Sequence, residues 1–287
     1  TVDVERIRAK KFRVLVDANH GSGSRLAGPL LAALGCETTL LGGEADGAFA
    51  HTPEPTAENL VGVAAEAAKR KADVCFCQDP DADRLAVIDE QGHYLGEELT
   101  LAVCVEHVLS KTKGPIVTNC STSRMSQDVA EKHGVPFYRS AVGEANVVDE
   151  MLARGAVLGG EGNGGVIDPR VGLVRDSFVG MALWLDAMAA RDITVSELAG
   201  EMPRYAIAKT KVSLPPEKVA TGLDALAAHF TDATADRMDG LRLDWPGRWL
   251  LVRASNTEPI VRIVAEAETD DAAHALCGAA GKVLEGV

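Results

Sequence analysis

The sequence has no apolar run long enough to span a bilayer, and its first residues, Thr1 to Arg8, lack the apolar core of a signal peptide. It also lacks an excess of basic residues, because 42 Asp and Glu against 29 Lys and Arg leave a formal charge of −13. Nucleic acids and anionic membranes select for basic surfaces, so neither is expected as the main partner. We therefore expect a cytoplasmic protein, in which a few local arginines can still bind an anionic small molecule.

Cysteine pairs with the spacing of redox or zinc motifs are also absent. The six cysteines form no C-x-x-C pair, and several lie in apolar runs, where a thiol behaves as a small core residue. We expect reduced, buried thiols. The length of 287 residues, with 46% hydrophobic and 25% charged residues, predicts a globular protein of two or three domains.

Strand and helix patterns alternate along most of the chain. After a short charged lead-in, residues 1–96 predict one α/β domain, and residues 97–200 repeat the pattern as a second. Residues 201–287 alternate as strands around two helices and predict a smaller α+β domain. The expected fold class is α/β, with mixed sheets in two consecutive α/β domains followed by the α+β domain.

Three aspartates at alternate positions, Asp79, Asp81 and Asp83, are followed at once by Arg84 and lie between two strand-like apolar runs. Ligands of α/β proteins bind at the carboxyl ends of such strands. Like charges this close repel one another unless a positive group lies among them. Mg²⁺ binds through a few carboxylates and keeps coordination positions for water and phosphate. The stretch therefore predicts a magnesium loop.

This stretch has two other interpretations. Counted from Asp79, Glu90 is the twelfth residue, as in an EF-hand calcium loop. Such a loop needs glycine at its sixth position, where this chain has Arg84, and its flanks are helices rather than strands. A solvated acidic turn without a metal remains the alternative, and the apolar strand that precedes the aspartates favours the metal.

A glycine-rich stretch, residues 159–165, follows another apolar strand and contains Glu161 and Asn163. Glycines allow close backbone approach, and a carboxylate with an amide can hold sugar hydroxyls. A flexible hairpin is the alternative. Arg170 and Arg175 follow, and each could face an anion or be an ordinary surface arginine.

A polar segment between two predicted strands near the C-terminus brings together the donors that a phosphate monoester needs. Arginine supplies bidentate charged hydrogen bonds, and hydroxyl and amide groups fill the remaining oxygens. A polar hairpin is the alternative. The predicted phosphate-binding residues are Arg253, Ser255, Asn256, Thr257 and Arg262.

An earlier glycine-rich turn, residues 21–23, precedes a predicted helix. It could cradle a phosphate at the helix N-terminus, but it lacks the dinucleotide fingerprint and a Walker lysine. A tight strand-to-helix turn is an equally good interpretation.

In their order along the chain, the three motifs resemble those of the α-D-phosphohexomutase superfamily, most closely its phosphoglucosamine mutase and phosphoglucomutase/phosphomannomutase branches. Residues 79–84 are similar to the family's D-x-D-x-D-R magnesium loop. Residues 161–164 resemble its G-E-x-S-G sugar loop, and residues 253–259 its R-x-S-x-T-E-P phosphate loop. The similarity runs from about Phe12 to the C-terminus.

This resemblance implies the family's second, third and fourth domains and an isomerase activity. A phosphoryl group would move between the C6 and C1 oxygens of a hexose or hexosamine phosphate through a bisphosphate, with the aminosugar favoured. Mg²⁺ on Asp79, Asp81 and Asp83 would offset charge during transfer, and Arg84 would belong to the catalytic site. The glycine-rich loop would orient the sugar, and the C-terminal segment would hold the phosphate that is not reacting.

Three departures from the family pattern limit these implications. No stretch of the T-A-S-H-N-P type, which carries the family's catalytic serine, occurs here, so we expect either a fragment or a chain unable to run the family mechanism alone. Asn163 replaces the usual serine and Gly165 a frequent histidine. Ala141 lies where relatives often have lysine, which leaves the acid–base residue and the sugar open.

Two rival functions follow from these departures. The first is a non-catalytic phosphosugar-binding module without the serine domain. The second is a phosphatase that uses Asp79 as its nucleophile, which is disfavoured because Arg84 follows the loop and two further motifs have no place in such an enzyme.

Overall fold

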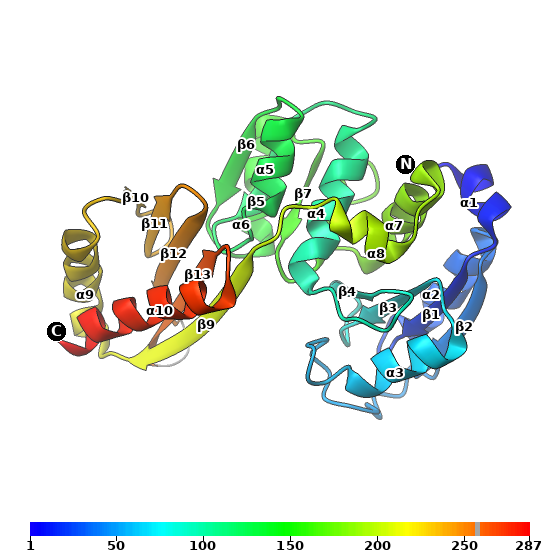
Figure 1. Ribbon diagram of the computed structural model, residues 1–287, viewed down its shortest axis with the longest axis horizontal. Helices are drawn as coiled ribbons and strands as arrows, with labels where there is room; N and C mark the ends of the chain where they lie inside the picture. Colours follow the sequence, from blue (N-terminus) through cyan, green and yellow to red (C-terminus); the bar gives the residue numbers. More distant parts are fainter. Residues whose placement is uncertain (256–258) are drawn as a thin grey trace. The chain divides into compact units, whose positions relative to one another are not determined.

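The computed structural model describes residues 1–255 and 259–287, which form two compact units. The larger unit comprises residues 1–139 and 143–203 and carries two four-stranded sheets. The smaller unit comprises residues 140–142 and 204–287 and carries a five-stranded sheet. Figure 1 labels the helices and strands of both units.

The first sheet of the larger unit has the strand order β2-β1-β3-β4, with β1 parallel to β2 and β3, and β4 antiparallel to β3. Every residue of β3 is buried, which explains its continuous apolar sequence. Helices α2 and α3 make the crossovers. The bounds are β1 Arg13–Asp17, α2 Ser24–Ala33, β2 Glu37–Leu41, α3 Val61–Arg70, β3 Val74–Gln78 and β4 Leu85–Ile88.

The second sheet has the order β6-β5-β7-β8, with β5 parallel to β7, and β7 antiparallel to β8. Strand β8 was not predicted, because three residues after a glycine-rich run give little periodicity. The bounds are β5 Ile116–Asn119, α5 Met125–Lys132, β6 Phe137–Ser140, α6 Glu144–Arg154, β7 Leu158–Glu161 and β8 Gly165–Ile167.

Two long helices, α4 (Glu97–Leu109) and α7 (Ser177–Arg191), are buried on nearly all sides and pack against each other. A short helix, α8 (Val195–Gly200), follows and begins with a capping box at Thr194. The charged lead-in, predicted without regular structure, forms α1 (Val4–Lys10), which packs on α7. Its seven residues are too few for a clear helical period.

The smaller unit is an antiparallel sheet of order β10-β11-β12-β13-β9, with α9 and α10 packed on one face (Figure 1). Its core joins Val261 and Ile263 of the sheet to Leu226 of α9 and Leu276 of α10. The bounds are β9 Ala206–Ser213, α9 Pro216–His229, β10 Thr234–Asp236, β11 Leu241–Trp245, β12 Arg248–Ala254, β13 Ile260–Ala267 and α10 Asp270–Glu285.

The predicted fold class is confirmed: two mixed α/β sheets precede an antiparallel sheet with helices. All six cysteines are free, and five of them are buried. None of the helices in the described part of the chain combines the length and apolar character that crossing a membrane requires.

Candidate functional site

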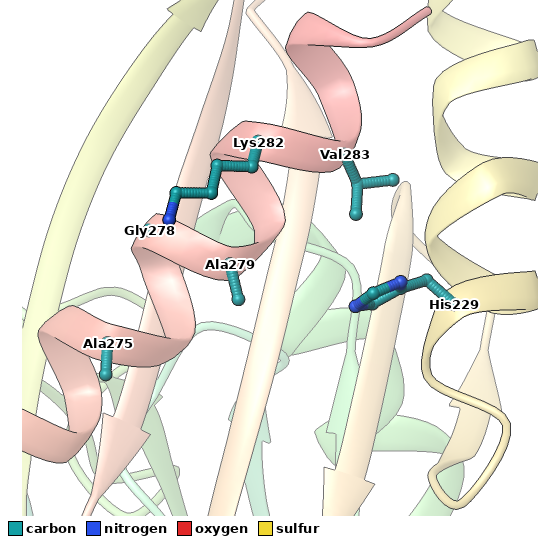
Figure 2. Close-up of a pocket in the computed structure, with 6 residues that line it drawn as sticks. All are labelled: His229, Ala275, Gly278, Ala279, Lys282 and Val283. Atoms are coloured by element: carbon teal, nitrogen blue, oxygen red, sulfur yellow. The ribbon is translucent and has the colours of Figure 1, made fainter.

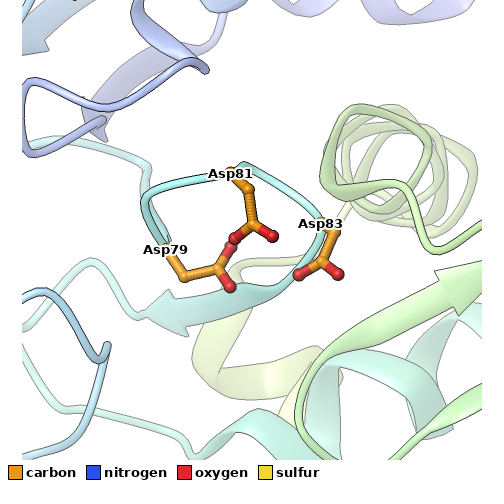
Figure 3. Close-up of side chains that lie close together, drawn as sticks. All are labelled: Asp79, Asp81 and Asp83. Carbon is orange, nitrogen blue, oxygen red and sulfur yellow. The ribbon is translucent and has the colours of Figure 1, made fainter. Parts of the chain in front are cut away.

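The acidic loop connects β3 to β4, and Figure 3 shows its three carboxylates turned toward one another. One oxygen from each of Asp79, Asp81 and Asp83 lies within 4.8 Å of the others. Ala82 between them has a φ of +62°, a left-handed conformation that is uncommon for alanine. Ser177 donates a hydrogen bond of 2.6 Å to the carbonyl oxygen of Ala82 and thereby holds the turn against the start of α7.

The pKa of Asp79 is raised to about 7, mainly by burial and also by the charges of Asp83 and Asp81, although a hydrogen bond from the backbone N–H of Arg84 opposes the shift. The Arg84 guanidinium compensates little, since its Nε lies 3.5 Å from Asp79 Oδ2 and 3.7 Å from Asp83 Oδ1. Within residues 1–255 and 259–287, buried Asp83 Oδ1 accepts no hydrogen bond. The loop thus carries more negative charge than its neighbours neutralise.

These features fit a hard divalent cation. The donors are carboxylate oxygens, they converge, and one is buried without a hydrogen bond. Asp79, Asp81 and Asp83 would hold the ion, and its chemistry there would be to offset the charge of a phosphoryl group.

The glycine-rich stretch is a tight hairpin between β7 and β8, in which Glu161 pairs with Gly165. The hairpin packs against β4, the strand that follows the acidic loop, and the N–H of Leu85 in β4 donates to the carbonyl oxygen of Gly164 at 3.2 Å. Gly164 has a φ of +82°, and a Cβ there would lie 2.2 Å from the Leu85 carbonyl oxygen. Only glycine allows this approach, so the hairpin and the acidic loop are held as neighbours.

Glu161 is buried and fully engaged by protein groups. Its Oε1 accepts hydrogen bonds from Asn119 Nδ2 at 2.6 Å and from the Gly143 N–H at 3.1 Å, and its Oε2 pairs with Arg175 at 2.7 Å. Asn163 differs, because its Oδ1 is buried yet has no hydrogen-bond partner among the described residues. Sugar binding by Glu161 and Asn163 stays a prediction, and Asn163 has the more available atom.

The sequence did not reveal the position of Arg175, which is at the centre of the site. Its guanidinium contacts Asp83 of the acidic loop, Glu161 of the hairpin, and Glu144 at the start of α6. Arg170, by contrast, pairs with its near neighbour Asp168 at 2.5 Å. The sequence alone allows either arginine to face an anion. Only the folded structure shows that Arg175 contacts the site and that Arg170 pairs with a near neighbour.

In the smaller unit, the predicted phosphate-binding segment joins β12 to β13. Arg253 and Arg262 lie directly opposite each other in the two strands, and the Ser255 N–H donates to the Ile260 carbonyl oxygen at 2.9 Å. Arg253 also pairs with Asp239 at 3.2 Å. The predictions for Asn256 and Thr257 lie outside the described residues.

A further cation, Lys211 of β9, lies directly opposite Arg262 on its other side. Arg253, Arg262 and Lys211 therefore form one row across three strands, which we call the cation row. The neighbours Val261 and Ile263 face the helices, so the row lies on the opposite face of the sheet. The sequence shows alternating lysines in β9 but not the register that places Lys211 here.

One hollow of the smaller unit is lined by none of the predicted site residues. A pocket of about 510 Å³ lies between the end of α9 and α10, lined mainly by small and apolar side chains with His229 and Lys282 (Figure 2). The turn at residues 21–23 packs tightly on the acidic loop, since a Cβ on Gly21 would lie 2.6 Å from the Pro80 carbonyl oxygen. This contact supports the interpretation of that turn as a tight connection.

Comparison with known proteins matches three consecutive segments of the chain to three domains of one family. Residues 1–92 match the family model of phosphoglucomutase/phosphomannomutase α/β/α domain II, residues 97–205 match domain III, and residues 212–280 match the C-terminal domain. These matches cover most of the chain.

Curated relatives agree with the family models. A phosphoglucomutase/phosphomannomutase of Thermococcus kodakarensis is 36% identical over 289 residues, covering 99% of this chain and 63% of the relative. A probable phosphoglucosamine mutase of Thermococcus gammatolerans is 36% identical, covering 96% and 62%. The chain thus spans less than two thirds of the length of these relatives.

Solved structures share the fold. A phosphoglucomutase/phosphomannomutase family protein from Burkholderia thailandensis has a TM-score of 0.84 at 29% identity, covering 99% of this chain and 63% of its own. An Aspergillus fumigatus N-acetylphosphoglucosamine mutase, solved in complex with GlcNAc-6P and magnesium, has a TM-score of 0.69 at 16% identity and covers 98% of this chain and 63% of its own. The domain matches and the identities together place this chain in the phosphoglucomutase/phosphomannomutase family, of which it carries domains II, III and IV.

Proposed function

We propose that this chain is the part of a phosphohexomutase that binds Mg²⁺, sugar and phosphate. The reaction would move a phosphoryl group between C6 and C1 of a hexose or hexosamine phosphate through a bisphosphate. The observation that carries the proposal is the acidic loop, whose three converging carboxylates are only partly neutralised. Relatives named phosphoglucosamine mutase favour an aminosugar phosphate as substrate.

In this mechanism, each motif has one task. Asp79, Asp81 and Asp83 hold the cation, and Arg84 adds positive charge beside the transferring phosphoryl group. Glu161 and Asn163 orient the sugar through its hydroxyls, with the free Asn163 Oδ1 as acceptor. Arg253, Ser255, Asn256, Thr257 and Arg262 hold the phosphate that does not react.

The free, mostly buried thiols are in keeping with a reducing compartment, and we place the activity in the cytoplasm. The formal charge of −13 does not oppose an anionic substrate, because the cation row supplies local positive charge.

The test is an activity assay of the protein extended upstream of Thr1, against the 6-phosphates of glucosamine, glucose and mannose. We expect Mg²⁺-dependent isomerisation, fastest with glucosamine 6-phosphate, and loss of turnover in Asp81→Ala. Retained Mg²⁺-dependent turnover in Asp81→Ala would contradict the proposed metal role. Sugar phosphate binding without turnover in the extended protein would favour a binding module, and phosphate release without isomerisation would favour a phosphatase.

A further inference from the structure

Arg175 uses all three of its guanidinium nitrogens on three different segments. Nη2 contacts Asp83 in the acidic loop, Nη1 lies 2.7 Å from Glu161 Oε2 in the hairpin, and Nε lies 3.1 Å from Glu144 Oε2 on α6. The Arg175 backbone N–H donates to the same Glu144 oxygen at 3.0 Å. The side chain is only 17% exposed, so these contacts are shielded from solvent.

The two oxygens of Asp83 are treated differently. Oδ2 accepts a hydrogen bond from Arg175, while Oδ1 is buried and accepts none among the described residues. Oδ1 is therefore the Asp83 oxygen open to a cation shared with Asp79 and Asp81. Carboxylates that bind metals are commonly held in orientation by such a hydrogen bond from outside the coordination sphere.

We infer that Arg175 is a positioning residue that orients Asp83 toward the cation and couples the acidic loop to Glu161 of the hairpin. The inference rests on the proposed function, because it presupposes that the loop takes up Mg²⁺. The guanidinium is a rigid plane, so a shift of Asp83 at one edge is transmitted to Glu161 at another. Lysine has a single ammonium on a flexible stem and cannot hold the same fork.

The sign of the effect on Mg²⁺ binding separates positioning from simple charge. Removing a positive charge beside the loop would, by Coulomb attraction alone, strengthen the binding of a cation. Loss of an orienting partner instead weakens metal binding, by about 10–100-fold in known sites. A loss of affinity in the absence of Arg175 therefore reports orientation.

The experiment is calorimetric titration of the whole chain with MgCl₂ at pH 8 and low salt. We expect Arg175→Met to bind Mg²⁺ about tenfold more weakly than wild type. Arg175→Lys keeps the charge and is expected to fall between the two. The control is Arg154→Met, which removes an arginine of α6 paired with Glu150, and it should leave Mg²⁺ affinity unchanged.

A double-mutant cycle tests the coupling to Glu161. Glu161→Gln should weaken Mg²⁺ binding in wild type, because Arg175 then neutralises Asp83 more completely. In the Arg175→Met background, Glu161→Gln should weaken Mg²⁺ binding less than it does in wild type. The two effects on Mg²⁺ affinity should differ by more than about twofold, which is the deviation from additivity found for independent sites. An equal effect in both backgrounds would mean that charge acts through space, and would overturn the coupling.

The outcomes distinguish the inference from the function on which it rests. A wild-type chain that takes up no Mg²⁺ would overturn both. If wild type binds Mg²⁺ but Arg175→Met binds it equally well or more tightly, only the positioning role is overturned. A variant with lower thermal stability and unchanged Mg²⁺ affinity would show Arg175 to be merely structural.

Discussion

Asp186 and the acidic loop both bury carboxylates in the larger unit, but they differ in how completely neighbouring groups neutralise them. Asp186 on α7 has no exposed surface and is bound by Arg6, His107 and Lys111. Burial acts to raise the pKa of Asp186, yet the hydrogen bonds from these three groups lower it below its usual range. In the acidic loop, by contrast, the pKa of Asp79 is raised to about 7.

The difference identifies which charge cluster is complete. Arg6 on α1, His107 on α4 and Lys111 just after α4 all donate to Asp186 on α7, so that cluster fixes helices to one another. The acidic loop gathers three aspartates with one weakly placed arginine, Arg84, and one that is shared, Arg175. We therefore interpret the acidic loop, which lacks countercharge in the folded protein, as the cluster that a ligand completes.

The smaller unit shows the same imbalance with the opposite sign. Arg262 lies between Arg253 and Lys211, and like charges directly opposite each other destabilise a sheet. Of these three cations, only Arg253 has a carboxylate partner among the described residues, namely Asp239. We therefore interpret the cation row as a place for an anion.

The largest expected effect comes from breaking the complete cluster. Asp186→Asn should lower the free energy of unfolding by about 3 kcal/mol, the low end for a broken buried ion pair, because Arg6 and Lys111 are partly exposed. Urea unfolding measures this. The control is Asp192→Asn, which removes an exposed partner of Lys10 and should cost about 0–1 kcal/mol. Equal losses in the two variants would contradict the comparison.

Breaking the incomplete cluster should act on the ligand rather than on the fold. Asp81→Asn is expected to weaken Mg²⁺ binding by more than about 100-fold. Loss of a residue that only orients a metal ligand costs up to about 100-fold, and Asp81 is proposed to be a ligand itself. Its unfolding free energy without Mg²⁺ should not fall, since a repelling charge is removed. Calorimetry and urea unfolding give the two readouts. Asp232→Asn, an exposed aspartate of the smaller unit, is the control, and a less stable Asp81→Asn would refute this prediction.

The next largest effect concerns pH, because the two clusters should change the free energy of unfolding with pH in opposite directions. The folded pKa of Asp186 is lowered, so its contribution is present above about pH 4 and is lost as the pH falls below it. The folded pKa of Asp79 is raised to about 7, so in Mg²⁺-free protein stability is lost as the pH rises from about 4 to 7.

Urea unfolding of wild type, Asp186→Asn and Asp79→Asn from pH 3 to pH 8 measures these slopes. Subtracting the Asp186→Asn curve should isolate the loss on the acid side. Subtracting the Asp79→Asn curve should isolate the loss between pH 4 and 7, and saturating Mg²⁺ should reduce it. If both difference curves slope in the same direction with pH, the two clusters do not affect stability in opposite ways and the prediction is wrong.

The smallest expected effect concerns the cation row. Lys211→Met should raise the unfolding free energy by about 0.2–1 kcal/mol, because it removes a like charge opposite Arg262. It should also weaken the binding of inorganic phosphate in a calorimetric titration. Lys209→Met is the matched control, since Lys209 lies opposite the apolar Val264. If both variants bind phosphate equally, Lys211 does not belong to the row's function.

The sequence by itself determined the motifs, their order and their local setting. The alternating aspartates between two strands, the glycines around Glu161 and the arginines of the C-terminal segment are readable because each lies within a few residues of its partners. The fold class followed from the same local periodicity, which side-chain burial in helices and strands imposes on neighbouring positions.

Only the tertiary structure decided which distant groups meet. Arg175 and Asp83 are 92 residues apart, and Arg6 and Asp186 are 180 apart. Lys211 joins Arg262 through a register that depends on how β9 pairs with β13. Local sequence carries propensity and period but no record of such pairings, because they depend on which buried surfaces pack together once the chain has closed its long loops.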